Sequence, residues 1–294
     1  MFSFLPSPLK GAVSFLIYLI NTILLTVPLI LISLLKFILP FQPVVVILDR
    51  ILMGIAGLWI YINSVNTDLF CKIDWDVRGL DKLTPRQWYL VLSNHQSWVD
   101  ILVLQKTLRK KVPMLKFFLK KELIWVPFLG LAWWALDFPF MKRYSREFLA
   151  KNPHMKGKDL ESTRKACQKF KHTPVSIMNF VEGTRYTPEK AKTSAFSHLL
   201  TPKAGGIAFV LGSMDQCLNH ILDVTIVYPD RVPSFWSFIS GKTRKIIVDC
   251  QLLEIGWQIK GDYFNDPVFK AQFCEWLNQL WQEKDRKIEH LLSS

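Results

Sequence analysis

His95 and Asp100 are spaced in a way that suits acid–base chemistry. They occur in "SNHQSWVD", which follows the apolar run "WYLVL" and precedes the periodic run "ILVLQKTL". The first run predicts a buried strand and the second a helix. A histidine at a strand end points toward the sheet edge where α/β proteins place ligands. Asp100 could fix one imidazole nitrogen as a donor and leave the other as a base, although a structural histidine would show the same spacing.

The sequence does not mark a nucleophile belonging to the protein itself. No G-x-S-x-G pattern occurs, and nothing distinguishes the nearby Ser93 or Ser97 as a nucleophile. We therefore expect His95 to act as a base on a hydroxyl group of the substrate.

A second stretch, "FVEGTR" (Phe180 to Arg185), follows the predicted strand "VSIMNFV". Gly183 permits a tight turn with exposed backbone N–H groups. Thr184 adds a hydroxyl, and Arg185 adds a planar guanidinium suited to phosphate. The pattern favours an anion-binding turn, and a simple β-turn with a surface ion pair between Glu182 and Arg185 is the alternative.

Together the two stretches resemble motifs of the glycerolipid acyltransferase family, which includes the 1-acylglycerol-3-phosphate acyltransferases. The first family motif, N-H-x-S-x-x-D, is met by Asn94, His95, Ser97 and Asp100. The third, F-P-E-G-T-R, is met by Phe180, Glu182, Gly183, Thr184 and Arg185, with Val181 in place of the proline.

Weaker matches extend the resemblance. The family segment K-x-E-L…P-x-x-G corresponds to "KKELIWVPFLG", with Lys120 or Lys121 as its lysine. The second motif resembles "FPFMKR" through Arg143, without the usual first glycine, and the fourth resembles "VTIVYP" to Pro229. The resemblance covers roughly Leu80 to Pro229 and points to a bacterial membrane-anchored branch of probable acyltransferases.

The resemblance implies acyl transfer from acyl-CoA or acyl carrier protein to the sn-2 hydroxyl of 1-acylglycerol-3-phosphate, giving phosphatidic acid. It assigns His95 as the base and Asp100 as the group that stabilises the imidazolium. The glycerol phosphate would be held by Arg143 and by the turn Glu182, Gly183, Thr184 and Arg185. Asn94, Ser97 and Lys121 would support the site. No metal, cofactor or covalent enzyme intermediate is expected.

Two alternatives to this function remain open. The first is an acyltransferase of the same family that acts on another lysophospholipid or on glycerol-3-phosphate. The second is a module on the same fold that binds lipid or a carrier protein without turnover.

The first 68 residues are expected to anchor the chain in a membrane, and residues 69–294 to form the catalytic domain. Gly11 to Leu35 contains no charged residue and is long enough to cross a bilayer as a helix. Ile51 to Val65 is a shorter apolar run. We expect a membrane-embedded helical hairpin that enters or crosses the bilayer; one span plus one amphipathic helix is the alternative. A cleaved signal peptide is disfavoured, because the apolar region is too long and no small-x-small site follows.

A third apolar run, Leu123 to Phe140, is interrupted by Pro127 and Gly130. Basic residues flank it on both sides, whereas a spanning helix normally carries its positive excess on one side. We expect it to lie in the membrane interface or to be re-entrant, with a buried core segment as the alternative.

The alternation of strand and helix patterns from about Leu69 predicts an α/β fold with a mixed β-sheet flanked by helices. "ILDVTIVYP" and "RKIIVDCQLLEI" predict further strands, and "DLESTRKACQKFK" and "PKAGGIAFVL" predict helices. A C-terminal helix is expected to start at Pro267, capped by Asp266. Its apolar stripe should dock on the domain: Phe269, Phe273, Trp276, Leu277, Leu280 and Trp281.

The formal net charge is +13, without a long basic tract or a zinc-finger pattern. Beside a membrane anchor, such a surface suits anionic lipids, phosphorylated substrates or an acidic carrier rather than nucleic acid, with a merely solvated basic surface as the alternative. The five cysteines show no CxxC and the six histidines no metal-ligand spacing. The cysteine pattern predicts a reducing compartment. The resemblance implies a bacterial inner membrane and an acyl donor made in the cytoplasm, so we expect the catalytic domain to face the cytoplasm.

Overall fold

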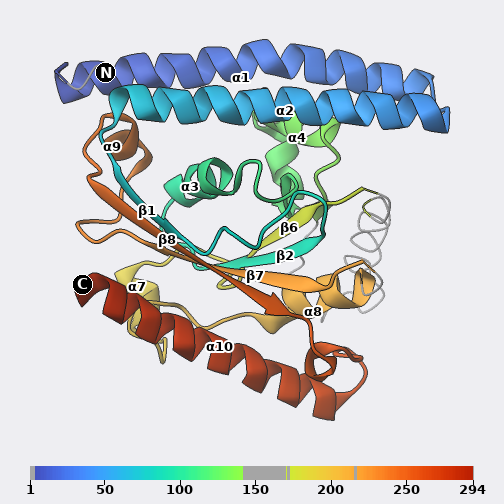
Figure 1. The fold of residues 1–294 in the computed structure, drawn as a ribbon, viewed down its shortest axis with the longest axis vertical. Coiled ribbons are helices and arrows are strands. Elements are labelled where there is room, and N and C mark those ends of the chain that lie inside the picture. The colour runs from blue at the N-terminus through green and yellow to red at the C-terminus, as the bar shows by residue number, and fades with distance from the viewer. Residues whose placement is uncertain (1–3, 142–169, 171–172, 215–216, 294) are drawn as a thin grey trace.

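The computed structural model describes residues 4–141, 170, 173–214 and 217–293. Within this part of the chain, a mixed six-stranded sheet has the order β1-β8-β7-β2-β6-β3 (Figure 1). Neighbouring strands are parallel except for β7 and β8. The strands are β1 (Asp74–Arg78), β2 (Tyr89–Ser93), β3 (Leu115–Phe117), β6 (Ser176–Phe180), β7 (His220–Val227) and β8 (Lys245–Glu254). The predicted mixed α/β architecture is confirmed.

The central strand β2 lies between β6 and β7 and is buried along its whole length. Its last residue, Ser93, is in register with Phe180 of β6 and with Val224 of β7. Because all three strands are parallel, their carboxyl ends lie at one edge of the sheet. The two motif-bearing loops leave the sheet at this edge.

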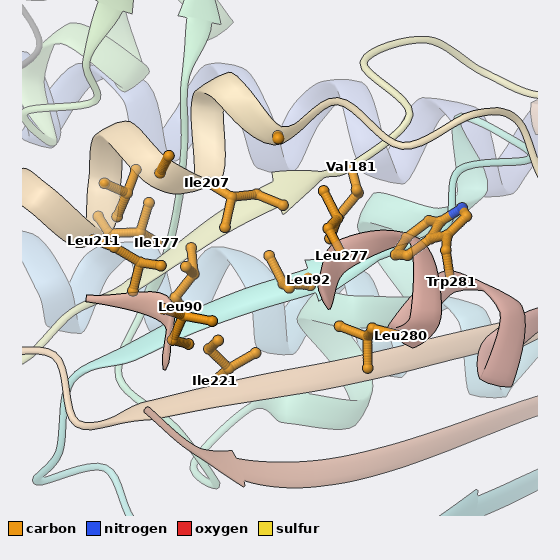
Figure 2. Close-up of a cluster of buried hydrophobic side chains, with 14 of the residues drawn as sticks. Leu90, Leu92, Ile177, Val181, Ile207, Leu211, Ile221, Leu277, Leu280 and Trp281 are labelled. Carbon is orange, nitrogen blue, oxygen red and sulfur yellow. The ribbon is translucent and has the colours of Figure 1, made fainter. Parts of the chain in front are cut away.

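Helices cover both faces of the sheet. On one face α3 (Val99–Leu108) lies between the sheet and the N-terminal helices (Figure 1). On the other face lie α8 (Ala204–Ser213) and α10 (Pro267–Ser293). Figure 2 shows the buried cluster on this second face, formed by side chains of the strands and of both helices. It includes Leu90, Leu92, Ile177, Ile221, Ile207, Leu211, Leu277, Leu280 and Trp281. Because helices cover both faces of the sheet, β2 is buried at every residue and β7 at all but its first.

The C-terminal helix α10 follows the sequence prediction closely. Asp266 Oδ1 accepts hydrogen bonds from the amides of Val268 and Phe269, as a helix cap does. Four members of the apolar stripe are buried against the domain: Phe273, Leu277, Leu280 and Trp281. The other two, Phe269 and Trp276, pack at the edge of the same cluster. Docking on the domain is therefore confirmed.

For some other helices and strands the sequence prediction differs from the structure or lies outside the described residues. The helix expected in "PKAGGIAFVL" begins at Ala204, two residues after Pro202. The helix expected in "DLESTRKACQKFK" lies, apart from Phe170, outside the described residues. Strands β1 and β3 were not predicted, because β1 is largely charged and β3 has three residues. Pairing with β8 and β6 makes them strands.

The N-terminal helices α1 (Ser7–Ile38) and α2 (Gln42–Phe70) form the predicted hairpin. They run side by side along the top of Figure 1. Both are long and apolar enough to cross a membrane, judged by length and composition. Polar side chains join them internally: Asn21 Nδ2 donates to Asn63 Oδ1 at 2.8 Å in a buried contact. Such hydrogen bonds hold apolar helices together where water is excluded.

The hairpin lies across the domain and is attached to it at both ends. Near the start of α1, Gly11 packs so closely on Trp236 of α9 (Phe235–Ile239) that a Cβ would lie 2.9 Å from the indole. Near the end of α1, Lys36 Nζ lies 2.8 Å from Asp137 Oδ2. At 1.5 Å per residue these attachments are about 38 Å apart. Between these attachments α1 exposes large apolar side chains, among them Phe15, Leu19, Leu24, Leu31 and Leu35.

The run Leu123–Phe140 folds back on itself. It comprises most of η1 (Lys121–Trp125), then α4 (Leu129–Ala135) and the start of β5 (Phe140–Met141). Strand β5 pairs with β4 (Leu119–Lys120), which directly precedes the run. The run thus returns to its starting point, as expected of a segment that does not cross.

The structure bears on the core alternative for this run and leaves the interfacial one open to test. Ala132, Ala135 and Leu136 are buried with Leu29 of α1, as the core alternative requires. Trp125 is 85% exposed, however, so this part of the run is free to meet lipid. Interfacial binding stays a prediction.

Candidate active site

The imidazole of His95 is held from two sides at the end of β2. Its Nδ1 lies 2.8 Å from Asp100 Oδ2, which is the contact expected from the spacing. Its ring stacks on Phe180, with centroids 3.8 Å apart and planes 12° from parallel. In the neutral tautomer that donates from Nδ1 to this carboxylate, Nε2 carries no proton and has the chemistry of a base.

Asp100 is fully buried in the first turn of α3 and accepts four hydrogen bonds. Its Oδ2 also accepts from the amides of Gln96 at 2.7 Å and Ser97 at 2.8 Å. Its Oδ1 accepts from the hydroxyl of Tyr228 at 2.6 Å. Burial, and then the charge of Asp100, raise the pKa of Tyr228 well above its usual value, so the hydroxyl remains a donor. Hydrogen bonds of this kind favour the charged form of a carboxylate.

The predicted supporting residues Asn94 and Ser97 bind backbone and shape the loop. The Asn94 amide exchanges two hydrogen bonds with the backbone of Ile226, both 2.9 Å long, and so extends the pairing of β2 with β7. Ser97 Oγ donates to the carbonyl of Pro233 and accepts from the amide of Val99. Both hydrogen bonds of the Ser97 hydroxyl therefore go to backbone groups and hold the loop in position.

The second loop, residues 181–185, adjoins the first. Gly183 has φ +68°, a left-handed conformation that glycine adopts without strain. Its amide donates to Phe180 O at 2.8 Å and closes the turn. The amide of Tyr186 donates to His95 O at 2.7 Å and joins the two loops directly. The two motifs, far apart in sequence, thus form one site.

Glu182 points inward and is 1% exposed. Burial raises its pKa to about 8, and the charge of Asp100 adds to the rise. The amides of Leu200 and His95 lie near enough to oppose it, yet within the described residues no hydrogen bond of ordinary geometry reaches either carboxyl oxygen. Because Glu182 is buried while Arg185 is exposed, the surface ion pair of the simple-turn alternative does not form.

Arg185 is exposed on the outer side of the turn. Its guanidinium carbon lies 4.6 Å from the ring centroid of Trp98, a residue of the first motif that sequence reasoning passed over. Stacking of this kind orients the planar guanidinium while its N–H groups stay accessible.

Two further cations, also missed from the sequence, flank the turn. Lys190 Nζ donates to Thr184 Oγ1 at 2.6 Å and to Arg185 O at 3.1 Å. The side chain of Lys203 lies over Gly183, where a Cβ would be 3.2 Å from its Nζ. With Arg185 these lysines form a concentration of positive charge suited to an anion. Their signal in the sequence was weak, because isolated lysines are common on surfaces.

Two predicted residues are not brought into this cluster. Lys121 is exposed at the start of η1. Arg143 lies outside the described residues, so its predicted contact with phosphate stays a prediction.

Residues 74–228, which contain both loops, match the Acyltransferase family, and the chain belongs to this family. The predicted membership of a glycerolipid acyltransferase family is thereby confirmed. The matched region includes His95, Asp100 and the 181–185 turn, but not α10.

Two curated relatives illustrate the similarity. An uncharacterized acyltransferase of Schizosaccharomyces pombe is 23% identical over 221 residues, 70% of this chain and 60% of that protein. The 1-acyl-sn-glycerol-3-phosphate acyltransferase epsilon of Mus musculus is 24% identical over 216 residues, 68% of this chain and 56% of that protein. The chain thus spans little more than half the length of these relatives.

Among solved structures, the 1-acyl-sn-glycerophosphate acyltransferase PlsC of Thermotoga maritima aligns with 94% of this chain and 98% of that one. The identity is 18% and the TM-score 0.46.

Proposed function

We propose that this protein is an acyltransferase that moves a fatty acyl group from acyl-CoA or acyl carrier protein to the sn-2 hydroxyl of 1-acylglycerol-3-phosphate. The observation that carries the proposal is the hydrogen bond from the Tyr186 amide to His95 O, which joins the base to the cationic turn. One acceptor molecule has the two matching groups, a hydroxyl to be deprotonated and a phosphate to be bound. Relatives named 1-acyl-sn-glycerol-3-phosphate acyltransferases support this choice of acceptor.

The proposed reaction is direct transfer without an acyl-enzyme. As the substrate oxygen attacks the thioester carbonyl, its proton passes to His95 Nε2. The new C–O bond forms, the C–S bond breaks, and the proton moves on to the departing sulfur. Asp100 stabilises the imidazolium meanwhile. General-base catalysis of this kind contributes about 10²–10⁴-fold.

The acceptor phosphate would bind at the 183–185 turn. Arg185 supplies a planar pair of donors, and Lys190 and Lys203 supply charge on either side of it. A contribution from Arg143 remains part of the proposal. No metal or further cofactor enters this mechanism, and its only co-substrate is the acyl donor.

We further propose that the hairpin lies in the membrane interface with its exposed apolar face in lipid. The support is its attachment to the domain at both Gly11 and Lys36, which a helix perpendicular to the membrane could not maintain with the domain in water. The basic surface would then face anionic head groups. The bacterial inner membrane and the cytoplasmic side stay predictions.

The acceptor is tested by acyl transfer with purified protein in phospholipid vesicles. Labelled 1-acylglycerol-3-phosphate, other lysophospholipids and glycerol-3-phosphate are compared, each with acyl-CoA and with acyl carrier protein as donor. We expect the first acceptor to give the highest kcat/KM. A higher kcat/KM for another compound would identify that compound as the acceptor instead. The absence of any transfer would favour the binding-module alternative.

The membrane contact is tested with two tryptophans of similar exposure. Trp125 is 85% exposed in η1, next to α4, which packs on α1. Trp257 is 81% exposed in η3 (Trp257–Ile259), whose Ile259 is buried in the same cluster as α10. We expect Trp125→Ser to weaken sedimentation with anionic vesicles and Trp257→Ser to leave it unchanged. Equal effects of the two substitutions would contradict the proposed orientation.

A further inference from the structure

The C-terminal helix α10 carries a fully buried lysine that the mechanism above does not use. Lys284 is 1% exposed, and its ammonium group contacts oxygen atoms of three consecutive residues of β7. It pairs with Asp223 Oδ1 at 2.9 Å and donates to Val224 O at 2.8 Å and Thr225 Oγ1 at 3.0 Å. Two of its N–H groups are used in hydrogen bonds, and the contact with Asp223 is an ion pair outside ordinary hydrogen-bond geometry.

This contact is costly for a helix that already docks through apolar side chains. Burial lowers the pKa of Lys284, and pairing with Asp223 opposes that shift. Replacing a buried ion pair by apolar residues of similar volume is often neutral or stabilising. Leu277 and Trp281 on the same helix already supply apolar contact. Docking alone therefore does not explain why this position is charged.

The three contacted residues lie where β7 supports the catalytic loop. Val224 is in register with Ser93, the last residue of β2. Two residues further along β7, Ile226 binds the Asn94 amide, and Tyr228 just beyond the strand binds Asp100. Asn94, the residue before His95, is thus held by β7, and Asp100, the partner of His95, is held by a residue just after β7.

We propose that Lys284 is a positioning residue for acyl transfer, which fixes β7 so that β7 in turn holds the His95–Asp100 pair in place. Apolar contacts are not directional, whereas two hydrogen bonds and an ion pair from one ammonium to three consecutive residues restrict the position of β7 along its own axis. The family match ends at residue 228, so α10 would contribute to the site from outside the matched region. The kinetic part of this proposal rests on the proposed function.

The test compares two double substitutions that each remove an ion pair between α10 and the sheet. The test variant is Lys284→Met with Asp223→Leu. The matched control is Lys287→Met with Asp249→Leu, which removes the partly exposed pair, 2.6 Å long, between α10 and β8. Thermal unfolding of both variants and of the wild type shows that each is folded at the assay temperature.

We expect the test variant to lose about tenfold in kcat, with KM for the acceptor changed less than about twofold, because small displacements of catalytic groups reduce the rate of the chemical step. The control should keep the kcat of the wild type. A merely structural role would lower the melting temperature of the test variant and leave its kcat unchanged.

A second readout does not depend on turnover. The proton on His95 Nδ1 should give a low-field NMR resonance, assigned by its loss in His95→Ala. We expect it to shift or vanish in the test variant and to persist in the control. If both kcat and the resonance stay as in the wild type, the proposal is overturned. If the wild type acylates no acceptor, the proposed function fails while the resonance still decides the role of Lys284.

Should the test variant not fold, Thr225→Val takes its place. This near-isosteric change removes one acceptor and keeps the Lys284–Asp223 pair. A smaller shift of the same resonance is expected, with a loss of about threefold in kcat. No change in either quantity would overturn the proposal.

Discussion

Asp100 and Glu182 are both buried carboxyl groups close to His95, yet their surroundings are opposite. Asp100 accepts four hydrogen bonds, two from backbone amides, one from Tyr228 and one from His95. Glu182 accepts none of ordinary geometry from the described residues, and its pKa rises to about 8. The two carboxyl groups thus share burial but differ in the hydrogen bonds that reach their oxygens, and hydrogen bonds to the charged form oppose the effect of burial.

The contrast separates the roles of the two loops. The loop of residues 94–100 surrounds a carboxylate with donors and so orients a base. The loop of residues 181–185 buries a carboxyl group whose pKa is raised to about 8 and directs Arg185 outward. Substitutions in the first loop should therefore act mainly on kcat, and those in the second on acceptor binding and on the pH dependence of stability.

The largest effect is expected for His95→Ala, which removes the base. Turnover should fall by about 10²–10⁴-fold, while expression and vesicle association stay unchanged. Asp100→Asn should lose somewhat less, because the imidazole remains but its orienting charge is gone. Steady-state rates of purified protein in vesicles measure both. Retention of more than about a tenth of wild-type turnover by His95→Ala would contradict general-base catalysis.

Glu182→Gln should alter how stability depends on pH. A folded-state pKa of about 8, above the ordinary 4.5, means that Glu182 contributes stability below pH 4.5 that is lost as the pH rises through 8. Each pKa unit corresponds to about 1.4 kcal/mol, so the wild type should lose a few kcal/mol that the glutamine variant keeps. Unfolding free energies at about pH 5 and about pH 9 test this difference. Parallel pH dependence in the two proteins would show that Glu182 is not buried in neutral form.

Tyr228→Phe tests whether the hydrogen bonds to Asp100 matter for catalysis as well as for stability. It leaves one buried carboxylate oxygen without its donor, which should cost about 1–3 kcal/mol of stability and also lower kcat. Tyr89→Phe is the matched control, since the Tyr89 hydroxyl bonds Thr84 and Gln87 at the opposite end of β2. The control should lose stability and keep kcat. Equal kcat values for the two variants would deny Tyr228 a role in orienting Asp100.

The smallest effect is expected for Arg185→Lys, which keeps the charge and loses the planar pair of donors. We expect KM for the lysophosphatidic acid acceptor to rise about tenfold, a change of about 1.4 kcal/mol, with KM for the acyl donor nearly unchanged. Initial rates with each substrate varied in turn measure the split. An equal rise in both KM values would point to a role in folding.

Local sequence patterns were sufficient to predict the strands and helices that carry the motifs. The apolar runs that became β2, β6, β7 and β8 are short, and their ends are marked by polar residues or proline. The periodic stripe and the Asp266 cap defined α10. Strands β1 and β3 could not be found in this way, because their conformation comes from pairing with β8 and β6.

By itself, the sequence determined that His95 and Asp100 meet. Five residues between a strand and a helix are enough to bring a carboxylate back onto an imidazole, and the glycine of the second motif is enough to form its turn. The contact of Tyr228 with Asp100, across 128 positions, was decided only by the tertiary structure. The same holds for the buried position of Lys284 against β7 and for the raised pKa of Glu182. These features depend on strand register and on the packing of helices, which place distant residues together and exclude water from them, and no local pattern encodes either.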